Sequence, residues 1–341
     1  MQNPQSTIRN PHLRAPLLPA SAGPWFNGGP VAGWRGATTL VEFWTYSCVN
    51  CLRTLPALRE WHARYGSAGL TVLGVHTPEF PFERDPANVA QALRDLGVTF
   101  PVVLDNDRAI WSRFANRFWP QRYLIDREGR IRYERAGEGG EAATEQAIRD
   151  LLGEGQPDLP SPSPYLTLAD DTSIGAVCAP ATPELFAGYY RGVSGNPGGF
   201  QEDTVARYTD PGGYREGYIH LQGRWRVDAD AATFAGPEPG WLRVAWRGLA
   251  VNAVLAPAAN TTGALQVRLG PLAAPRDQAR AHDLTIVAPR LYELGAAHPD
   301  ASGLTMLTLV PATSGLAVYS FTFARCGAGS AECGVPTPAS S

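Results

Sequence analysis

Two cysteines at close spacing, Cys48 and Cys51, stand between an apolar run and a helical pattern. The run Thr38–Trp44 is typical of a strand buried on both faces, and Val49–Tyr65 carries apolar residues at helical spacing. The first thiol therefore lies at a helix N-terminus, where unpaired backbone N–H groups stabilise a thiolate. The second lies one turn further on, so the pair can form and break a disulfide while the fold persists. This arrangement predicts dithiol–disulfide exchange.

Composition narrows the class of protein. The 341 residues suffice for about two domains, and 44% hydrophobic with 18% charged residues is a globular balance. The formal net charge is −3 without a basic run, so nucleic acid is not an expected partner. No stretch reaches the roughly 20 apolar residues of a membrane helix, and the N-terminus lacks the apolar core of a signal peptide. The chain is thus not exported, or it follows a removed signal, or it is the soluble part of a membrane protein.

The periodicity changes along the chain. Strand and helix patterns alternate in the first half and predict a mixed α/β sheet covered on both faces. Its expected elements include strands over Leu70–His76 and 100–104, and Gly66 is expected to end the helix after the cysteines. Short alternating runs in the second half, such as 217–221 and 224–227, predict an all-β sandwich of jelly-roll type. The expected order is a flexible N-terminal segment over 1–22, an α/β domain over 23–153, a Pro/Ser-rich linker over 154–183, a β-sandwich over 184–326 and a disordered tail over 327–341.

Three more cysteines lie in the second half of the chain. Cys326 and Cys333 bracket a short Gly-rich loop; they form a local disulfide, which favours an oxidising compartment, or remain free thiols. Cys178 is a buried or isolated thiol. Neither a second Cys-x-x-Cys nor a His pair is in register with Cys48 and Cys51, so we expect no metal site.

The residues around the cysteines resemble the thioredoxin superfamily. Glu42 stands six residues before Cys48, where thioredoxins carry a buried acid, and Pro56 stands five after Cys51, where they kink this helix. The resemblance implies a thioredoxin fold for the first domain.

Two further segments extend this resemblance. Trp119-Pro120 stands where the family places its cis-proline, and a segment around 79–97 resembles an addition found in the TlpA-like and peroxiredoxin-like branches. A cis Pro120 would present the backbone of Trp119 to an incoming substrate strand; otherwise it is an ordinary edge-strand proline.

A closer resemblance covers nearly the whole chain. Phe43–Pro56 resembles the Phe-Trp-Thr-Tyr-x-Cys-Ile-Asn-Cys-x-Arg-Thr-Leu-Pro motif of DipZ-type thiol–disulfide interchange proteins, and Gly74–Phe80 and Trp119–Asp126 also match. In that family a membrane-embedded electron carrier precedes a thioredoxin-like domain and a domain resembling carbohydrate-binding modules; the first part is not found in this sequence. The resemblance implies an extracytoplasmic location, protein disulfides as substrates, a membrane-embedded electron donor and a carbohydrate as a candidate ligand.

The expected catalytic residues are Cys48, Cys51, Glu42 and Pro120. Cys48 attacks the substrate, and Cys51, deeper in the helix, resolves the mixed disulfide. Glu42 is either the exposed side of an edge strand or, among apolar neighbours on a central strand, a desolvated acid that exchanges a proton with Cys51. The redox-active disulfide itself serves as the redox group, and no cofactor is expected.

The expected substrate groove consists of Trp119, Trp44, Val49 and Asn50, with Trp119 narrowing the groove or stacking on the substrate. His76 is interpreted as a polar group at a strand end. The aromatic residues of the second domain form a sugar-stacking platform or fill its core, and we favour the core.

The favoured function is a thiol–disulfide oxidoreductase that mainly reduces its partners, because Val49-Asn50 offers no cation that would over-stabilise the thiolate. One alternative is a thiol peroxidase: Thr45 lies three residues before Cys48, although the Pro that precedes this Thr in such enzymes is absent. Another is a carbohydrate- or cell-surface-binding protein on a thioredoxin scaffold.

Overall fold

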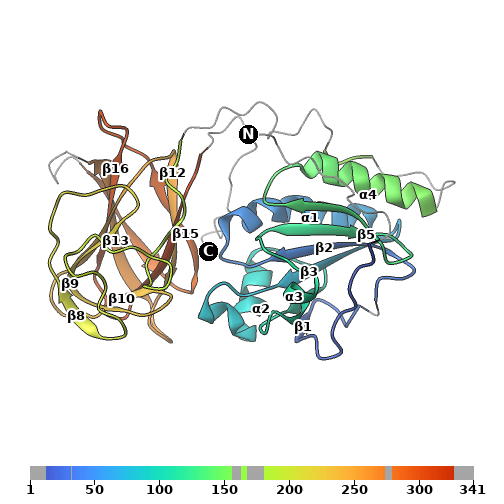
Figure 1. The fold of residues 1–341 in the computed structure, drawn as a ribbon, viewed down its shortest axis with the longest axis horizontal. Coiled ribbons are helices and arrows are strands. Elements are labelled where there is room, and N and C mark those ends of the chain that lie inside the picture. The colour runs from blue at the N-terminus through green and yellow to red at the C-terminus, as the bar shows by residue number, and fades with distance from the viewer. Residues whose placement is uncertain (1–12, 32, 156–162, 167–179, 273–278, 326–341) are drawn as a thin grey trace. The chain divides into compact units, whose positions relative to one another are not determined.

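The chain divides into two compact units (Figure 1), one within Met1–Ala176 and the other within Val177–Ala328. The computed structural model describes residues 13–31, 33–155, 163–166, 180–272 and 279–325. Among these residues, no helix is both long and apolar enough to cross a membrane. Most of the expected linker, Cys178, Cys326, Cys333 and the expected tail lie outside the described residues.

The first unit is built on a six-stranded sheet of order β1-β4-β3-β2-β5-β6. Its three central strands are parallel, and the three others run antiparallel to their neighbours. All seven residues of β2 are buried, as expected of a strand covered on both faces. The strands are β1 (Trp25–Phe26), β2 (Thr38–Trp44), β3 (Leu70–His76), β4 (Val102–Leu104), β5 (Gln121–Ile125) and β6 (Ile131–Ala136).

Helices cover both faces of this sheet. Leu40 and Trp44 of β2 share a core with α1, α2 and α4, whereas Val41 and Phe43 share a second core with α3. The alternation of side chains along one strand thus supplies two cores. The helices are α1 (Val49–Tyr65), the 3-10 turn η1 (Pro81–Arg84), α2 (Pro86–Asp95), α3 (Ala109–Arg113) and α4 (Glu141–Gly155).

The prediction of a flexible segment over 1–22 is wrong for residues 13–22. The backbone N–H of Ala15 donates to the Gly129 carbonyl at 2.9 Å, and that of Ile131 donates to the Leu13 carbonyl at 2.8 Å. The segment is ordered because it satisfies backbone groups at the β5–β6 hairpin. Residues 1–12 lie outside the described residues.

The named strands of the second unit all pair antiparallel, and the predicted fold class is confirmed for both halves of the chain. Its sheet has the order β14-β13-β16-β11-β9-β10-β17-β12-β15, with β7 on β17 and β8 on β9. The sheet curls around one apolar core. The strands are β7 (Leu185–Phe186), β8 (Val205–Tyr208), β9 (Ile219–Val227), β10 (Ala232–Phe234), β11 (Trp241–Trp246), β12 (Ala250–Ala256), β13 (Gly263–Pro271), β14 (Arg280–Ile286), β15 (Arg290–Ala296), β16 (Thr305–Pro311) and β17 (Ala317–Phe323).

One long strand, β9, joins the two parts of the curled sheet. Residues 219–222 pair with β11, and residues 223–227 pair with β8 and β10. Gly223 lies at this change of partner with φ +89°, and a Cβ there would lie 2.9 Å from Gly240 Cα. Only glycine fits this corner without strain.

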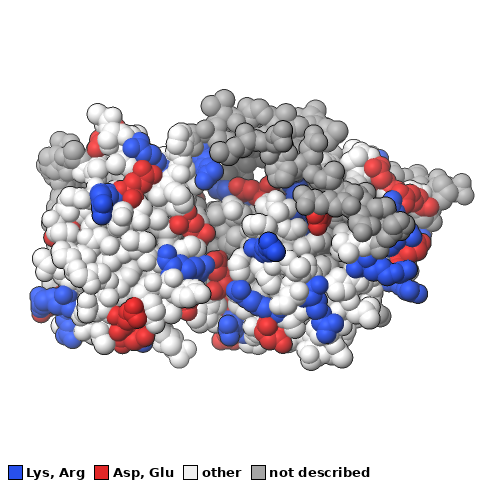
Figure 2. Space-filling view, in the orientation of Figure 1, with Lys and Arg blue, Asp and Glu red and all other residues white. Residues whose placement is uncertain are grey.

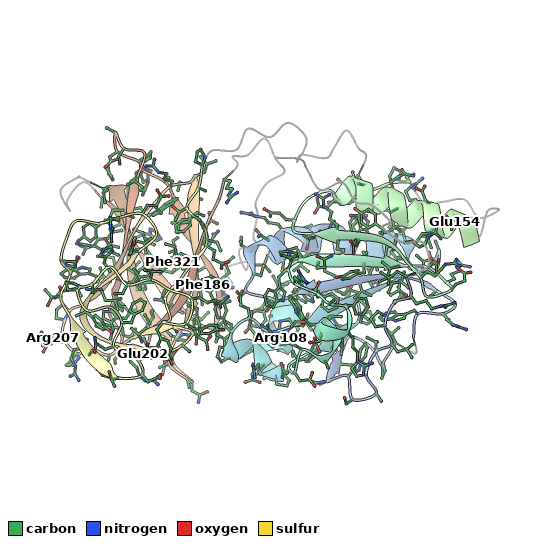
Figure 3. The ribbon with its side chains drawn as sticks, in the orientation of Figure 1. Arg108, Glu154, Phe186, Glu202, Arg207 and Phe321 are labelled. Carbon is green, nitrogen blue, oxygen red and sulfur yellow. The ribbon has the colours of Figure 1, made fainter. Side chains whose placement is uncertain are left out.

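The aromatic residues of the second unit divide between core and surface. Trp225 and Trp246 are fully buried, which agrees with the favoured interpretation that these rings fill the core. Figure 3 shows Phe321 inside the unit and Arg207 on its outside. On the face in Figure 2, Arg residues are interspersed with Asp and Glu, in keeping with the low net charge.

A substitution at Gly74 of β3 can test the packing of the first core. A Cβ at this position would lie 2.8 Å from Trp44 Nε1 and 3.1 Å from Val102 Cγ2. We expect Gly74→Ala to lower the free energy of unfolding by about 1–3 kcal/mol through overpacking. Urea unfolding of the reduced protein measures this change.

Gly153 provides the matched control. It lies in α4, and no atom would lie within 4 Å of an added Cβ. Gly153→Ala should leave stability unchanged or raise it by up to about 1 kcal/mol, because alanine favours the helix. Equal losses for the two variants would contradict the packing described.

Candidate active site

The two thiols lie at the start of α1, shortly after the end of β2. Cys48 is the N-cap residue of α1 and is partly exposed, whereas Cys51 is fully buried. The Cys51 thiol is hydrogen-bonded to Cys48. Burial first, and then this hydrogen bond and the neighbouring Cys48, raise the pKa of Cys51 well above its usual value. Cys48 is therefore the more accessible of the two thiols, and the environment of Cys51 favours its protonated form.

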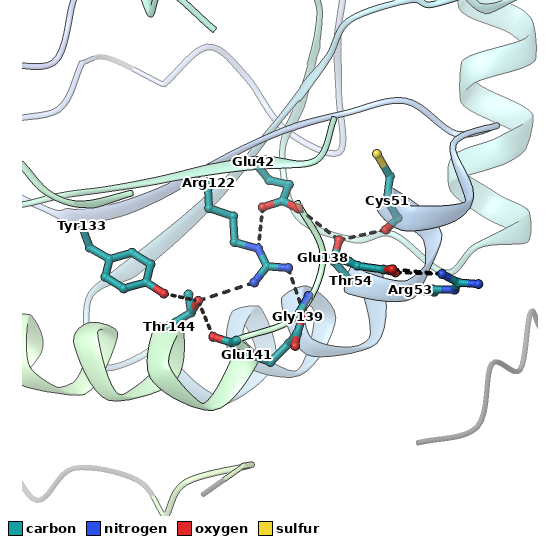
Figure 4. A network of polar contacts seen from close by, with 11 residues as sticks. Glu42, Cys51, Arg53, Thr54, Arg122, Tyr133, Glu138, Gly139, Glu141 and Thr144 are labelled. Carbon is teal, nitrogen blue, oxygen red and sulfur yellow. Dashed lines mark hydrogen bonds and ion pairs between the residues drawn. The ribbon is translucent and has the colours of Figure 1, made fainter. Parts of the chain in front are cut away.

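A buried carboxylate, Glu42 of β2, lies beside the cysteine helix (Figure 4). The Thr54 hydroxyl lies 3.0 Å from Glu42 Oε1 and 2.8 Å from the Cys51 carbonyl oxygen, and donates to these acceptors. Burial raises the pKa of Glu42, although the Arg122 guanidinium opposes this shift. Glu42 is thus central, not on an edge, and its charge adds to the rise in the pKa of Cys51.

Arg122 of β5 completes this network. Its Nε donates to Glu42 Oε2 at 3.0 Å, and its Nη2 donates to Glu141 Oε1 at 3.1 Å. The Arg122 side chain is fully buried, and its guanidinium lies over the Trp61 ring at 5.8 Å. At one end of the network, Glu42 contacts α1 through Thr54. At the other end, the side chain of Glu141 is 22% exposed and reaches the surface. Sequence analysis missed Arg122, although a cation within a buried central strand requires a counter-charge.

The Trp119–Pro120 peptide bond is cis, as expected from the sequence. The Trp119 indole donates from Nε1 to the Thr77 carbonyl at 3.1 Å and packs on Trp111 with ring centroids 4.3 Å apart. The Arg108 guanidinium lies over both rings. Trp119 is only partly buried, so its fixed ring can still line a groove beside the cis-proline.

Two predicted groove residues need correction. The prediction that Trp44 lines the groove is wrong, because its side chain is 1% exposed and packs over Gly74 in the core. Val49 is 8% exposed and offers almost no side-chain surface to a substrate. Asn50 remains partly exposed, with its Oδ1 3.4 Å from Arg53 Nη1.

Comparisons with known proteins agree with this geometry. The family models "AhpC/TSA family" and "Thioredoxin like C-terminal domain" match residues 30–134 and 182–324. The thiol–disulfide oxidoreductase YkuV of Bacillus subtilis is 30% identical over 116 residues, which cover 34% of this chain and 78% of YkuV. The chain belongs to the thioredoxin-like thiol–disulfide oxidoreductases.

Protein DipZ of Mycobacterium tuberculosis is similar over more of the chain, as the sequence motifs indicate. The two are 39% identical over 202 residues, which make up 59% of this chain but 29% of DipZ. The chain therefore matches under a third of the length of that relative. Among solved structures, an oxidised thioredoxin-like protein matches with a TM-score of 0.38 and 29% identity, over 42% of this chain and 98% of its own.

The buried ion pair gives a test of this site. Arg122→Met would leave Glu42 without its cation in a fully buried position, and we expect a loss of about 3–5 kcal/mol in the free energy of unfolding. Urea unfolding of the reduced protein at neutral pH measures the loss.

Arg53→Met is the control, because Arg53 pairs with Glu138 at a partly exposed site. It should cost less than about 1 kcal/mol. If Arg122→Met costs no more than this, Glu42 does not carry a charge that depends on Arg122.

Proposed function

We propose that this oxidoreductase reduces protein disulfides outside the cytoplasm through Cys48 and Cys51. The observation that supports it is the difference in exposure between the two thiols: Cys48 is partly exposed, whereas Cys51 is fully buried beside Glu42. The Cys48 thiolate attacks one substrate sulfur, the substrate disulfide breaks, and the other sulfur leaves as a thiolate. Cys51 then attacks the Cys48 sulfur, which releases the second substrate thiol. Two electrons pass to the substrate, and Cys48–Cys51 becomes a disulfide.

Glu42 supplies the acid–base step in this proposal. The raised pKa of Cys51 means that its proton must leave before it can attack, and Glu42 is the nearby carboxylate. Arg122 keeps Glu42 able to lose and regain that proton, because its cation opposes the effect of burial on the carboxyl. No cofactor is required, since the cysteine pair itself carries the electrons.

Cysteine substitutions test the proposed chemistry. Cys48→Ser should abolish reduction of insulin disulfides, because the attacking sulfur is lost. Cys51→Ser should accumulate a mixed disulfide between Cys48 and the substrate, visible by mass spectrometry without reductant. If wild type and Cys48→Ser reduce insulin equally, the first unit is only a scaffold.

The direction of electron flow follows from the absence of a cation between the cysteines. Val49 and Asn50 add no charge that would over-stabilise the Cys48 thiolate. We therefore expect a reduction potential of roughly −200 to −300 mV from equilibration with glutathione, as in reducing members of this class. A value near about −120 mV, that of strong oxidants, would reverse the direction proposed.

Electron supply and the second unit belong to the same proposal. The resemblance of this chain to DipZ-type proteins suggests that a membrane-embedded donor re-reduces the oxidised cysteine pair and that the second unit binds a carbohydrate.

A surface group suited to sugar stacking consists of the partly exposed Trp241 and Tyr214, with the Arg243 guanidinium over both rings. Tryptophan emission that is unchanged by oligosaccharides in wild type and in Trp241→Ala alike would contradict a sugar site there.

A peroxidase is less well supported, although the AhpC/TSA family model matches the first unit. The Thr45 hydroxyl that would assist a peroxide is fully buried and donates to Glu83. It therefore cannot contact a peroxide at Cys48 without a rearrangement of this loop. Peroxide consumption by the reduced protein far faster than by free cysteine would revive this function.

A further inference from the structure

A second buried carboxylate lies near the cysteines, outside the Glu42 network. Glu83 belongs to η1, in the segment between β3 and α2, and is fully buried. Its Oε2 accepts the backbone N–H groups of Glu79 at 2.6 Å and Phe80 at 2.9 Å. These bonds explain the local turn but use only one of the two oxygens.

The other oxygen faces the loop that leads to Cys48. Glu83 Oε1 accepts from the Ser47 hydroxyl at 2.6 Å, from the Ser47 backbone N–H at 3.3 Å and from the Thr45 hydroxyl. Glu83 accepts from five donors, so the carboxylate is the form that this site accommodates. Burial raises the pKa of Glu83, and the bonds from Ser47 and Thr45 oppose that rise.

Loop 45–47, which Glu83 holds, contacts the backbone of Cys48 and the sulfur of Cys51. The Cys48 backbone N–H donates to the Thr45 carbonyl at 3.4 Å, and the Thr45 backbone is hydrogen-bonded to the Cys51 sulfur, which favours its thiolate. Thr45 therefore links Glu83 to the residue that must ionise in the second step of exchange. A shift of this loop would change the geometry at both cysteines at once.

His76 holds the same loop from β3. Its Nε2 accepts the Tyr46 backbone N–H at 3.4 Å, and its ring stacks on Tyr46 with centroids 5.6 Å apart. Burial lowers the pKa of His76 to about 3, so it is neutral and acts as an acceptor only at Nε2. Each of the residues 45–47 is thus tied to a fully buried side chain.

We propose that Glu83 is a positioning residue for thiol–disulfide exchange: it fixes Thr45 and Ser47 so that Cys48 caps α1 and the Thr45 backbone meets the Cys51 sulfur. The segment that carries Glu83 is therefore part of the redox site, although it contributes no reacting atom. This inference rests on the proposed function for its reaction, but the redox equilibrium of the cysteine pair reports on it without any protein substrate.

The test separates the hydrogen bonds of Glu83 to loop 45–47 from its hydrogen bonds to residues 79 and 80 of its own turn. Glu83→Gln disturbs both. Ser47→Ala removes only a hydroxyl that binds Oε1, and Thr45→Val removes a hydroxyl that binds Oε1 and also lies 3.3 Å from His76 Nε2. Each variant should shift the equilibrium constant with glutathione by about tenfold toward the disulfide, the effect of losing one hydrogen bond to a charged group. The shift has this sign because the Thr45 backbone bond to Cys51 favours its thiolate, which is a form of the reduced pair. The rate of insulin reduction should differ from that of the wild type in the same three variants.

Glu145→Gln is the matched control. Glu145 of α4 is also fully buried and accepts from the Tyr65 hydroxyl and from backbone N–H groups at residues 165 and 166. Its substitution should lower stability and leave the glutathione equilibrium within about twofold of wild type, because it has no bond to loop 45–47.

The outcomes are separable. If Thr45→Val and Ser47→Ala fold and their equilibrium constants stay within twofold of wild type, or shift toward the dithiol, Glu83 merely supports its own turn and the inference is overturned. These two variants decide the matter even if Glu83→Gln does not fold. A wild-type protein that equilibrates with glutathione but does not reduce insulin would contradict the proposed function and leave this inference intact.

Discussion

The Glu42–Arg122 ion pair is the interaction on which the first unit depends. Each partner is fully buried, and each would be a large energetic cost without the other. The pair joins β2, which leads to the cysteines, to β5, which follows the cis-proline. The two halves of the redox site are therefore held in register by the same charges that set the acidity of Glu42.

Two buried acids approach the cysteine pair from different elements. Glu42 reaches the helix through Thr54, and Glu83 reaches the preceding loop through Thr45 and Ser47. The first has a cation beside it and is suited to moving a proton, whereas the second accepts five hydrogen bonds and is suited to holding a shape. The same chemical group thus serves different ends because its partners differ.

The elements around the cysteines could be predicted from the sequence. Thr38–Trp44, Val49–Tyr65 and Leu70–His76 are observed with the expected bounds, because apolar periodicity and Gly66 mark them clearly. The predicted strand over 100–104 begins only at Val102, after Pro101, which has no N–H to donate. The pattern predicts two separate strands over 217–221 and 224–227, but these residues form one strand, β9.

The site was predictable only in part. Cys48, Cys51, Glu42 and Pro120 are marked by spacing and motif, and all four lie in the first unit where expected. Arg122 carries a signal, a cation inside an apolar strand. Glu83 carries none, because a Glu between Phe82 and Arg84 in a Pro-rich turn looks like a solvated side chain; only the tertiary structure brings it to residues 45–47.

The continuous strand β9 has a consequence for how the second unit comes apart. Its first residues pair with β11 and its last with β8 and β10, across the corner at Gly223. Neither part of the curled sheet can lose this strand without unpairing the other. We therefore expect amide protons on both sides of the corner to exchange through one cooperative opening, and a single protease cut not to release half of this unit alone.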